Sequence, residues 1–167
     1  MSDSDTQNQA NADNMIPVHT AVAHPWLCDI MGHMTTRHYT AIFDDASYLY
    51  FYRVFGWSGS DARDDNVGWA DVRHEVDYVD EVPAGDLLEV RASLQRLGGK
   101  SVTIAYEMYN LSKSSIAATL TSTCVLFDMD ARKAVTISDE MRASAEPFLA
   151  SAANTPNTAN TANTDSR

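Results

Sequence analysis

The sequence predicts an α+β domain in which an antiparallel sheet of about five strands wraps around one long central helix. Three observations support this fold class. A single long helical pattern follows one early strand, four more strand patterns come after the helix, and short turn sequences separate them. Antiparallel strands that share one helix form a layered sheet-and-helix domain. With 167 residues and 44% hydrophobic content, we expect one domain with a full core.

The helical pattern begins at residues 35–36 and ends at Gly56. Thr35 or Thr36 is expected to cap the N-terminus, and Gly56 suits the first position past the helix end. The C-terminal half is aromatic on nearly every side, so we expect other elements to wrap it. Apolar residues recur at the three- and four-residue spacing of a buried helix face, at Tyr39, Ile42, Phe43, Ala46, Leu49, Tyr50 and Val54.

The remaining elements follow in a simple order. Residues 15–23 read as the first strand, and residues 57–66 as a polar loop after the helix. A four-strand meander and a short C-terminal helix are expected next. The strands cover residues 67–79, 87–97, 102–111 and 116–129, with turns at 83–86 and at Gly98-Gly99, and the helix lies within 138–149.

Composition and charge exclude several classes of function. Residues 1–14 and 151–167 are polar or repetitive, so we expect disordered tails around a domain at 15–150. The net charge of −11 argues against nucleic-acid binding. No segment approaches the roughly 18 apolar residues of a membrane span, and no signal peptide is recognisable, so a cytoplasmic location is expected. Cys28 and Cys124 form no disulfide framework, and no spacing predicts a metal site.

Asp29, just before the long helix, is the candidate for chemistry. The free N–H groups and the positive end of the helix dipole stabilise anions at a helix N-terminus. They can hold Asp29 ionised and can stabilise the oxyanion that forms when a thioester carbonyl is attacked. The alternative is that Asp29 only caps the turn around Gly32, which a lone Asp-x-x-Gly pattern favours.

The segment Asp29-Ile-Met-Gly32-His33-Met34-Thr-Thr-Arg-His-Tyr39 resembles a known motif. It is similar to the Asp-x-x-Gly-His-Val/Met-Asn-Asn-x-x-Tyr motif of the hotdog-fold acyl-CoA thioesterases related to 4-hydroxybenzoyl-CoA thioesterase. The similarity covers roughly residues 17–147. It implies a hotdog fold, with Asp29 as nucleophile or general base and the backbone N–H of Thr36 as oxyanion donor. Thr35-Thr36 replaces the usual Asn pair, so only the backbone role carries over.

The resemblance also suggests substrate contacts around the motif, at Trp26, Gly32, Met34, Thr35, Tyr39 and Asp45. His33 is a candidate for orienting Asp29, for touching the substrate, or for tying down the loop. Tyr39 also suits core packing with a hydroxyl handle. Some hotdog thioesterases use a helix carboxylate as base, which makes Asp44 or Asp45 the competing catalyst. Adjacent helix residues point about 100° apart, so at most one of the two faces the site.

Coenzyme A binding requires basic side chains, because the coenzyme carries phosphates. Arg96 and Lys100 flank the Gly98-Gly99 turn in a locally basic span and are the candidates, although ordinary solvated charges explain them equally. For the acyl group, Trp26, Trp57, Trp69 and the tyrosines can line an apolar pocket or hold a quaternary ammonium by cation–π contact. The wording around Trp26 is similar to thioesterases of carnitine and betaine metabolism, while aromatic or medium-chain acyl groups suit the same residues.

The sequence therefore predicts an acyl-CoA thioesterase for a small or medium acyl group, with no metal or redox cofactor. One alternative is an enoyl-CoA hydratase of the same fold, whose motif places a His five residues after the Asp. Here His33 is four residues after Asp29. The other alternative is a non-catalytic acyl-CoA binding protein. A single curled sheet leaves one edge and one face uncovered, so we expect a homodimer or dimer of dimers, with the active site between subunits as the resemblance implies.

Overall fold

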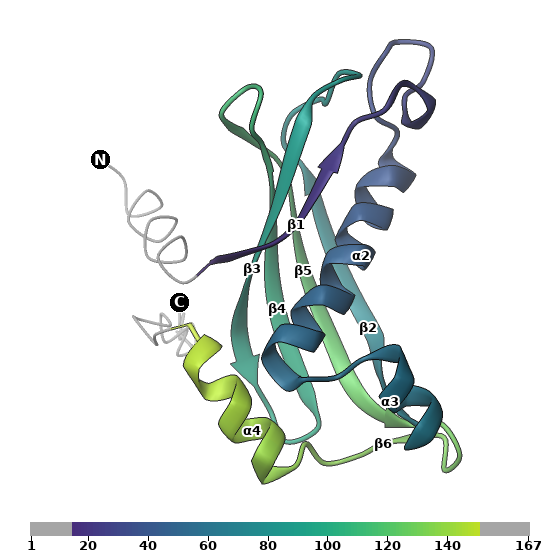
Figure 1. The fold of residues 1–167 in the computed structure, drawn as a ribbon, viewed down its shortest axis with the longest axis vertical. Helices are drawn as coiled ribbons and strands as arrows, with labels where there is room; N and C mark the ends of the chain where they lie inside the picture. The colour runs from purple at the N-terminus through teal and green to yellow at the C-terminus, as the bar shows by residue number, and fades with distance from the viewer. Residues whose placement is uncertain (1–14, 151–167) are drawn as a thin grey trace, which may run out of the picture.

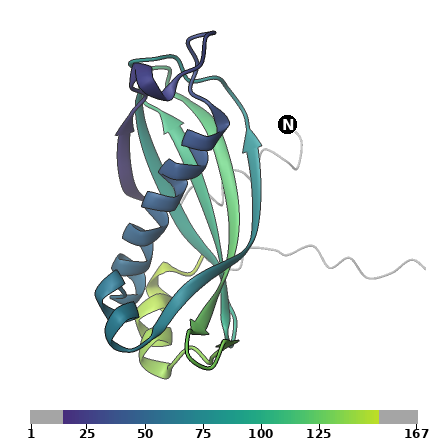
Figure 2. The same ribbon diagram turned by 90° about the vertical axis from the view of Figure 1, so that its right-hand side faces the viewer.

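The computed structural model describes residues 15–150 and places one long helix, α2 (Thr36–Phe55), across the concave face of a curved antiparallel sheet (Figures 1 and 2). The strand order is β1-β3-β4-β5-β2. The strands are β1 (Ile16–Val22), β2 (Val67–Tyr78), β3 (Leu87–Leu97), β4 (Ser101–Asn110) and β5 (Ser115–Asp128), and a short β6 (Lys133–Ala134) pairs with the end of β5. The predicted α+β class is therefore confirmed.

The first step of the predicted meander is wrong. β2 pairs with β5 at the edge of the sheet, whereas β3 lies between β1 and β4. The connection over residues 79–86 is longer than the two to five residues of an ordinary hairpin loop, and it carries the chain past the ends of β4 and β5. Its last residue is held by a hydrogen bond from the Ala23 amide to the Asp86 carbonyl, at 2.9 Å.

The short helices depart from the sequence prediction in one place. Residues 57–66 are not a simple loop, because they contain α3 (Gly59–Asp64). Ser58 and Asp61 close a capping box at its start, but six residues are too few to show an apolar period. Two 3-10 turns, η1 (Pro25–Leu27) and η2 (Glu146–Phe148), complete the elements. The predicted C-terminal helix is present as α4 (Asp139–Ala145), capped by the Ser138 hydroxyl.

The core forms between α2 and the concave side of the sheet. Phe43 is 1% exposed and packs with Tyr50 against Tyr106 of β4, with ring centroids 6.2 and 6.1 Å from the Tyr106 ring. Burial of a side chain the size of Phe43 stabilises the fold by about 1.5–3 kcal/mol. The opposite side of α2 is exposed at Tyr48, Leu49 and Tyr52, so the expectation of a fully wrapped helix is wrong for a single chain. The sheet covers only one side.

The two ends of α2 are built differently. Gly56 adopts φ +66° and its N–H bonds to the Tyr52 carbonyl, which ends the helix as predicted. Thr35 occupies the N-cap position, but its side chain makes no capping bond. Its hydroxyl is buried and has no partner within residues 15–150. The N-terminus of α2 is thus held by backbone contacts rather than by a side-chain cap.

The predicted tails, residues 1–14 and 151–167, lie outside the described residues. Within residues 15–150, none of the helices has both the length and the apolar character needed to cross a membrane.

Candidate active site

Asp29 lies in a tight turn between η1 and α2. Its backbone N–H donates to the His33 carbonyl at 2.9 Å, and the Gly32 N–H donates back to the Asp29 carbonyl at 3.0 Å. Its Oδ1 accepts from the amides of Met31, at 2.8 Å, and His33, at 3.4 Å. Gly32 has φ +83°, a region that side chains disfavour. The turn therefore fixes one carboxylate oxygen, while Oδ2 makes no hydrogen bond to the described residues and faces solvent.

The N-terminus of α2 follows this turn directly. The Thr35 amide donates to the Leu27 carbonyl at 3.0 Å, which ties the start of the helix to η1. The Thr36 amide, at the first helical position, has no acceptor within residues 15–150. An exposed carboxylate and an unpaired helix amide thus belong to one short, backbone-braced segment.

The connection between β2 and β3 supports that segment from behind. The Met34 amide donates to the Val82 carbonyl at 2.8 Å, and the Tyr39 hydroxyl reaches the Asp80 carbonyl at 3.3 Å. His33 Nδ1 lies 3.3 Å from a Glu81 carboxylate oxygen, so the His33 imidazole contacts Glu81, while only the His33 backbone bonds to Asp29. The pKa of Tyr39 is raised, mainly because the phenol is buried and to a smaller extent because acidic groups lie nearby.

The other predicted site residues are spread along the molecule. Trp26 is 71% exposed and stacks on His24, with ring centroids 4.2 Å apart, and Met34 is buried. Asp45 faces solvent on α2. Arg96 and Lys100 flank the β3–β4 turn, which lies beside α4 at the end of the sheet opposite the Asp29 turn (Figure 1). A single chain therefore does not bring the predicted phosphate-binding pair to Asp29.

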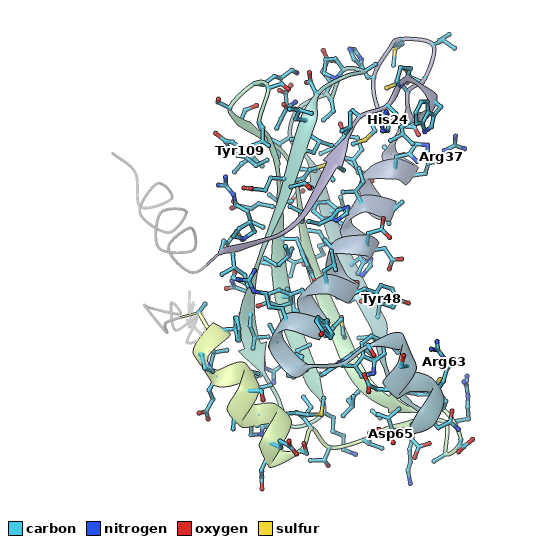
Figure 3. All side chains as sticks on the ribbon, viewed as in Figure 1. His24, Arg37, Tyr48, Arg63, Asp65 and Tyr109 are labelled. Carbon is cyan, nitrogen blue, oxygen red and sulfur yellow. The ribbon has the colours of Figure 1, made fainter. Side chains whose placement is uncertain are left out.

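Basic side chains nearer to Asp29 come from other elements. Arg37 follows Thr36 on α2 and lies with His24 at the same end of the molecule (Figure 3). Lys113 reaches the Asp80 carboxylate at 3.2 Å and the Glu81 carbonyl at 2.7 Å, so it is tied to the connection that braces the site. The sequence motif did not single out Arg37, because a charged residue in a first helical turn is common.

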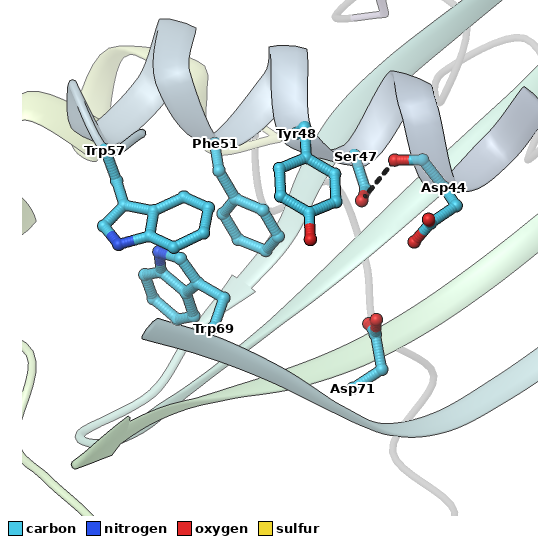
Figure 4. Close-up of a pocket in the computed structure, with 7 residues that line it drawn as sticks. All are labelled: Asp44, Ser47, Tyr48, Phe51, Trp57, Trp69 and Asp71. Carbon is cyan, nitrogen blue, oxygen red and sulfur yellow. Dashed lines mark hydrogen bonds between the residues drawn. The ribbon is translucent and has the colours of Figure 1, made fainter. Parts of the chain in front are cut away.

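A second group of polar residues lies farther along α2. Asp44 on the helix and Asp71 on β2 face each other across a cavity (Figure 4). Ser47, three residues after Asp44 on α2, also lines the cavity, and its hydroxyl donates to the Asp44 carbonyl at 2.7 Å. Burial raises the pKa of Asp44, and the negative charges of Asp71 and then Asp45 raise it further, while His74 acts in the opposite direction. The sequence left Asp44 and Asp45 as alternatives, and only Asp44 lines this cavity.

Of the two carboxylates, Asp71 is the one that accepts hydrogen bonds from other side chains. Burial disfavours its charged form, but hydrogen bonds from Cys124, Ser122 and His74 outweigh that cost and lower its pKa. The distances to Asp71 Oδ1 are 2.9 Å from Cys124 Sγ, 3.0 Å from Ser122 Oγ and 3.2 Å from His74 Nε2. Burial first, and then the bond to Asp71, raises the pKa of the Cys124 thiol. Cys124 thus stays a neutral donor and is no nucleophile.

Aromatic side chains form the rest of the cavity wall (Figure 4). Phe51 and Trp69 stack with ring centroids 4.7 Å apart, and Trp57 meets Phe51 edge-on at 6.2 Å. Tyr48 lies 6.0 Å from Trp57, between the indoles and Asp44. The Trp57 indole is fixed by a bond to the Val67 carbonyl at 3.2 Å. The sequence suggested that Trp57 and Trp69 line a pocket, but not that Asp71 accompanies them.

Among residues 15–150, no three His, Cys, Asp or Glu side chains gather in a way that could hold a metal ion. The contacts described above define two candidate regions. One is the exposed Asp29 carboxylate at the N-terminus of α2, and the other is the acidic, aromatic cavity beside the middle of the same helix.

Comparison with known proteins identifies the family. Residues 23–144 match the model of the thioesterase-like superfamily, which is well over half of the chain. The chain belongs to the thioesterase-like superfamily. A search of curated proteins gave no match. The predicted relationship to hotdog-fold thioesterases is thereby confirmed.

Several solved structures have a similar fold. A hypothetical protein from Staphylococcus aureus, solved in complex with CoA, has a TM-score of 0.74 at 16% identity, covering 80% of this chain and 84% of that one. A thioesterase superfamily protein from Jannaschia sp. has a TM-score of 0.73 at 24% identity, covering 82% and 94%. A probable thioesterase from Escherichia coli has a TM-score of 0.64 at 20% identity, covering 78% and 97%. At these identities the likeness shows the fold.

The pKa of Asp44 tests the electrostatics of the cavity. Because Asp71 raises it more than Asp45 does, Asp71→Asn is expected to lower the Asp44 pKa by more than Asp45→Asn does. Neither change should bring it fully to its ordinary value, since burial is the largest cause. Carbon-13 NMR titration of the carboxyl groups measures this. Equal effects of the two substitutions would contradict the arrangement in which Asp44 faces Asp71.

Proposed function

We propose that this superfamily member is an acyl-CoA thioesterase that uses the Asp29 carboxylate. The observation that carries the proposal is the braced segment at the start of α2, which presents a carboxylate oxygen and the Thr36 amide without partners within residues 15–150. These are the two groups that acyl transfer needs, one to attack or deprotonate and one to stabilise the oxyanion. Membership of the thioesterase-like superfamily supports the reaction class.

The proposed reaction balances with water alone. Either Asp29 removes a proton from a water that attacks the thioester carbonyl, or Asp29 attacks first and water then hydrolyses the acyl-aspartyl anhydride. In both routes the negative charge that develops on the carbonyl oxygen is stabilised by the Thr36 amide. The C–S bond breaks, the CoA thiolate takes up a proton, and the acyl carbon gains an oxygen from water. The products are a free acid and CoA.

We further propose that the working unit is a dimer paired through β2. β2 is the longer edge of the sheet, with 12 residues against 7 in β1, and its outer side is unpaired within the described chain. Val72 on this strand is 59% exposed. Long unpaired edges of this kind favour pairing with a second copy. Antiparallel pairing about a twofold axis places the Val67 end of one β2 beside the Tyr78 end of the other.

Such a dimer would bring the separated groups together. The Tyr78 end of β2 lies with Tyr39 and the braced Asp29 turn, since the Tyr39 and Tyr78 rings are 5.3 Å apart. The Val67 end lies with Trp57 and the aromatic cavity. Asp29 of the partner subunit would then face the cavity of this chain. In the same dimer, Arg96 and Lys100 of one chain would lie at the end of the molecule that carries the partner's Asp29 turn. The phosphates of a CoA bound there could contact these two side chains.

Asp29→Asn tests the catalytic assignment. Asn keeps an acceptor for the Met31 amide, so the turn should stay folded, while a base or nucleophile is lost. Thiol release from a panel of acyl-CoAs should fall by at least about a hundredfold in kcat/KM. Asp139→Asn is the matched control and should retain activity, because Asp139 is exposed on α4, which contacts α2 and β3 at the end of the sheet away from the Asp29 turn.

Two other results of the same assay would decide against Asp29. If Asp29→Asn keeps its activity and Asp44→Asn loses it for every substrate, the helix carboxylate is the catalyst. If the parent protein binds acyl-CoAs but releases no thiol from any of them, the protein is a binding protein.

Val72→Lys tests the interface. A charged side chain at an exposed edge position disfavours strand pairing, so the variant should shift from dimer to monomer in sedimentation velocity. Leu111→Lys is a suitable control because Leu111 is also an exposed apolar residue but lies beyond the end of β4. A dimer that resists Val72→Lys, or that dissociates equally with Leu111→Lys, would show that β2 is not the interface.

A further inference from the structure

The cavity between α2 and β2 has a composition that singles out one type of ligand. Its volume is about 40 Å³, well below the range of about 300–1,000 Å³ for pockets that hold drug-sized ligands. Only one small end of an acyl group suits this size. One wall is aromatic and the other is acidic, and Ser47 lies on α2 between Tyr48 and Asp44 (Figure 4).

The aromatic wall presents ring surfaces to a cation. Trp69 stacks on Phe51, Trp57 meets Phe51 edge-on, and Tyr48 continues the wall toward Asp44. Indole faces carry the most negative ring potential among side chains, so a cation within about 6 Å of such a face is attracted to it. Trp57 is pre-organised for this role because its N–H is already bound to the Val67 carbonyl.

The acidic wall, formed by Asp44 and Asp71, adds negative charge to the cavity. Asp71 is ionised at neutral pH, because three hydrogen bonds lower its pKa despite burial. Asp44 faces it, and their mutual repulsion is part of what raises the pKa of Asp44. Among the described residues, no Lys or Arg side chain lines the cavity, and His74 is the only basic group beside Asp71. A cation bound between the carboxylates would relieve this repulsion.

Two buried polar groups near the cavity have no partner within residues 15–150. A smaller recess of about 10 Å³, about the size of one water, shares Asp44, Ser47 and Asp71 with the cavity and extends inward to Tyr106. Tyr106 is 1% exposed, and its hydroxyl has no hydrogen-bond partner within residues 15–150. The Trp69 indole N–H also lacks one there. Buried donors of this kind normally find a partner, and a ligand oxygen can supply it.

We propose that this cavity binds the quaternary ammonium end of a small cationic acyl group, held by Asp44, Asp71 and the faces of Trp57 and Trp69. The proposal rests on the proposed thioesterase function, whose substrate class it names. Neutral acyl groups of the same shape would leave the two carboxylates facing each other without a counter-charge. The unpaired hydroxyl of Tyr106 would bond to one bound water in the recess.

A matched pair of thioesters tests the preference. Trimethylammonioacetyl-CoA and 3,3-dimethylbutanoyl-CoA have the same shape and differ by a positive nitrogen in place of a neutral carbon. The parent protein should hydrolyse the cationic ester with a kcat/KM at least about tenfold higher. Asp71→Asn and Trp69→Leu should each reduce this ratio mainly by slowing the cationic ester. Asp139→Asn, an exposed carboxylate on α4, is the control and should leave the ratio unchanged.

Direct binding separates this proposal from the proposed function. Saturation-transfer NMR at constant ionic strength measures this binding, with tert-butyl alcohol as the neutral comparison ligand. Tetramethylammonium should bind saturably to the parent protein and more weakly to Asp71→Asn. Since Asn keeps acceptors for Ser122 and Cys124, this variant is expected to fold even if Trp69→Leu does not.

Equal hydrolysis of the two esters would overturn the cationic preference and leave the thioesterase function standing. If no acyl-CoA of the panel is hydrolysed, these two esters included, but tetramethylammonium binds and Asp71→Asn weakens its binding, the cation site is supported and the proposed function fails. Absence of both hydrolysis and binding overturns the inference.

Discussion

Burial of one face of α2 against the concave side of the sheet determines where every candidate functional group lies. Phe43 and Tyr50 lock the helix onto Tyr106 of β4, so the helix cannot rotate without opening the core. That orientation sets the Thr36 amide beside the Asp29 turn at one end. It also sets Asp44 toward β2 part-way along the helix, while Asp45, one residue later, points to solvent. The same packing thus positions both a reactive carboxylate and a cavity.

The two candidate regions are separated within one chain by the length of the helix. α2 has 20 residues and is therefore about 30 Å long, with the Asp29 turn at its start and Trp57 just past its end. The exposed side of α2 and the unpaired edge of β2 both adjoin the cavity. A second copy paired on β2 would cover this edge and deliver its own Asp29 turn to the cavity. The functional unit we propose is accordingly the dimer, and the acyl group bridges the two contributions.

Local signals in the sequence were sufficient for most elements. The apolar stripe and Gly56 located α2, and alternating residues located the five main strands. The pairing of β2 with β5 could not be predicted from the sequence, because strand order depends on long-range contacts. Residues 79–86 have the turn-forming composition of a hairpin loop, so β2 was expected to pair with β3. The α3 helix was missed because it is short and polar.

The site shows the same division. Asp29, Gly32 and the helix start are neighbours in the sequence, so a motif could reveal them. Asp71 comes together with Asp44, Ser122 and Cys124 only through sheet register and helix packing, and nothing in its immediate sequence distinguishes it from a solvated strand residue. Trp57 and Trp69 were recognised as candidates by residue type, but their acidic neighbours came from the fold.

Subunit complementation tests the central claim that each active site combines Asp29 of one subunit with the cavity of the other. Asp29→Asn protein and Asp71→Asn/Trp69→Leu protein, each nearly inactive on trimethylammonioacetyl-CoA, would be unfolded together, refolded and assayed. Random pairing makes half of the dimers mixed, and each mixed dimer has one intact site, so about a quarter of the parent activity should return. If the mixture stays as inactive as the two separate variants while mixed dimers form, the site lies within one chain and the account is wrong.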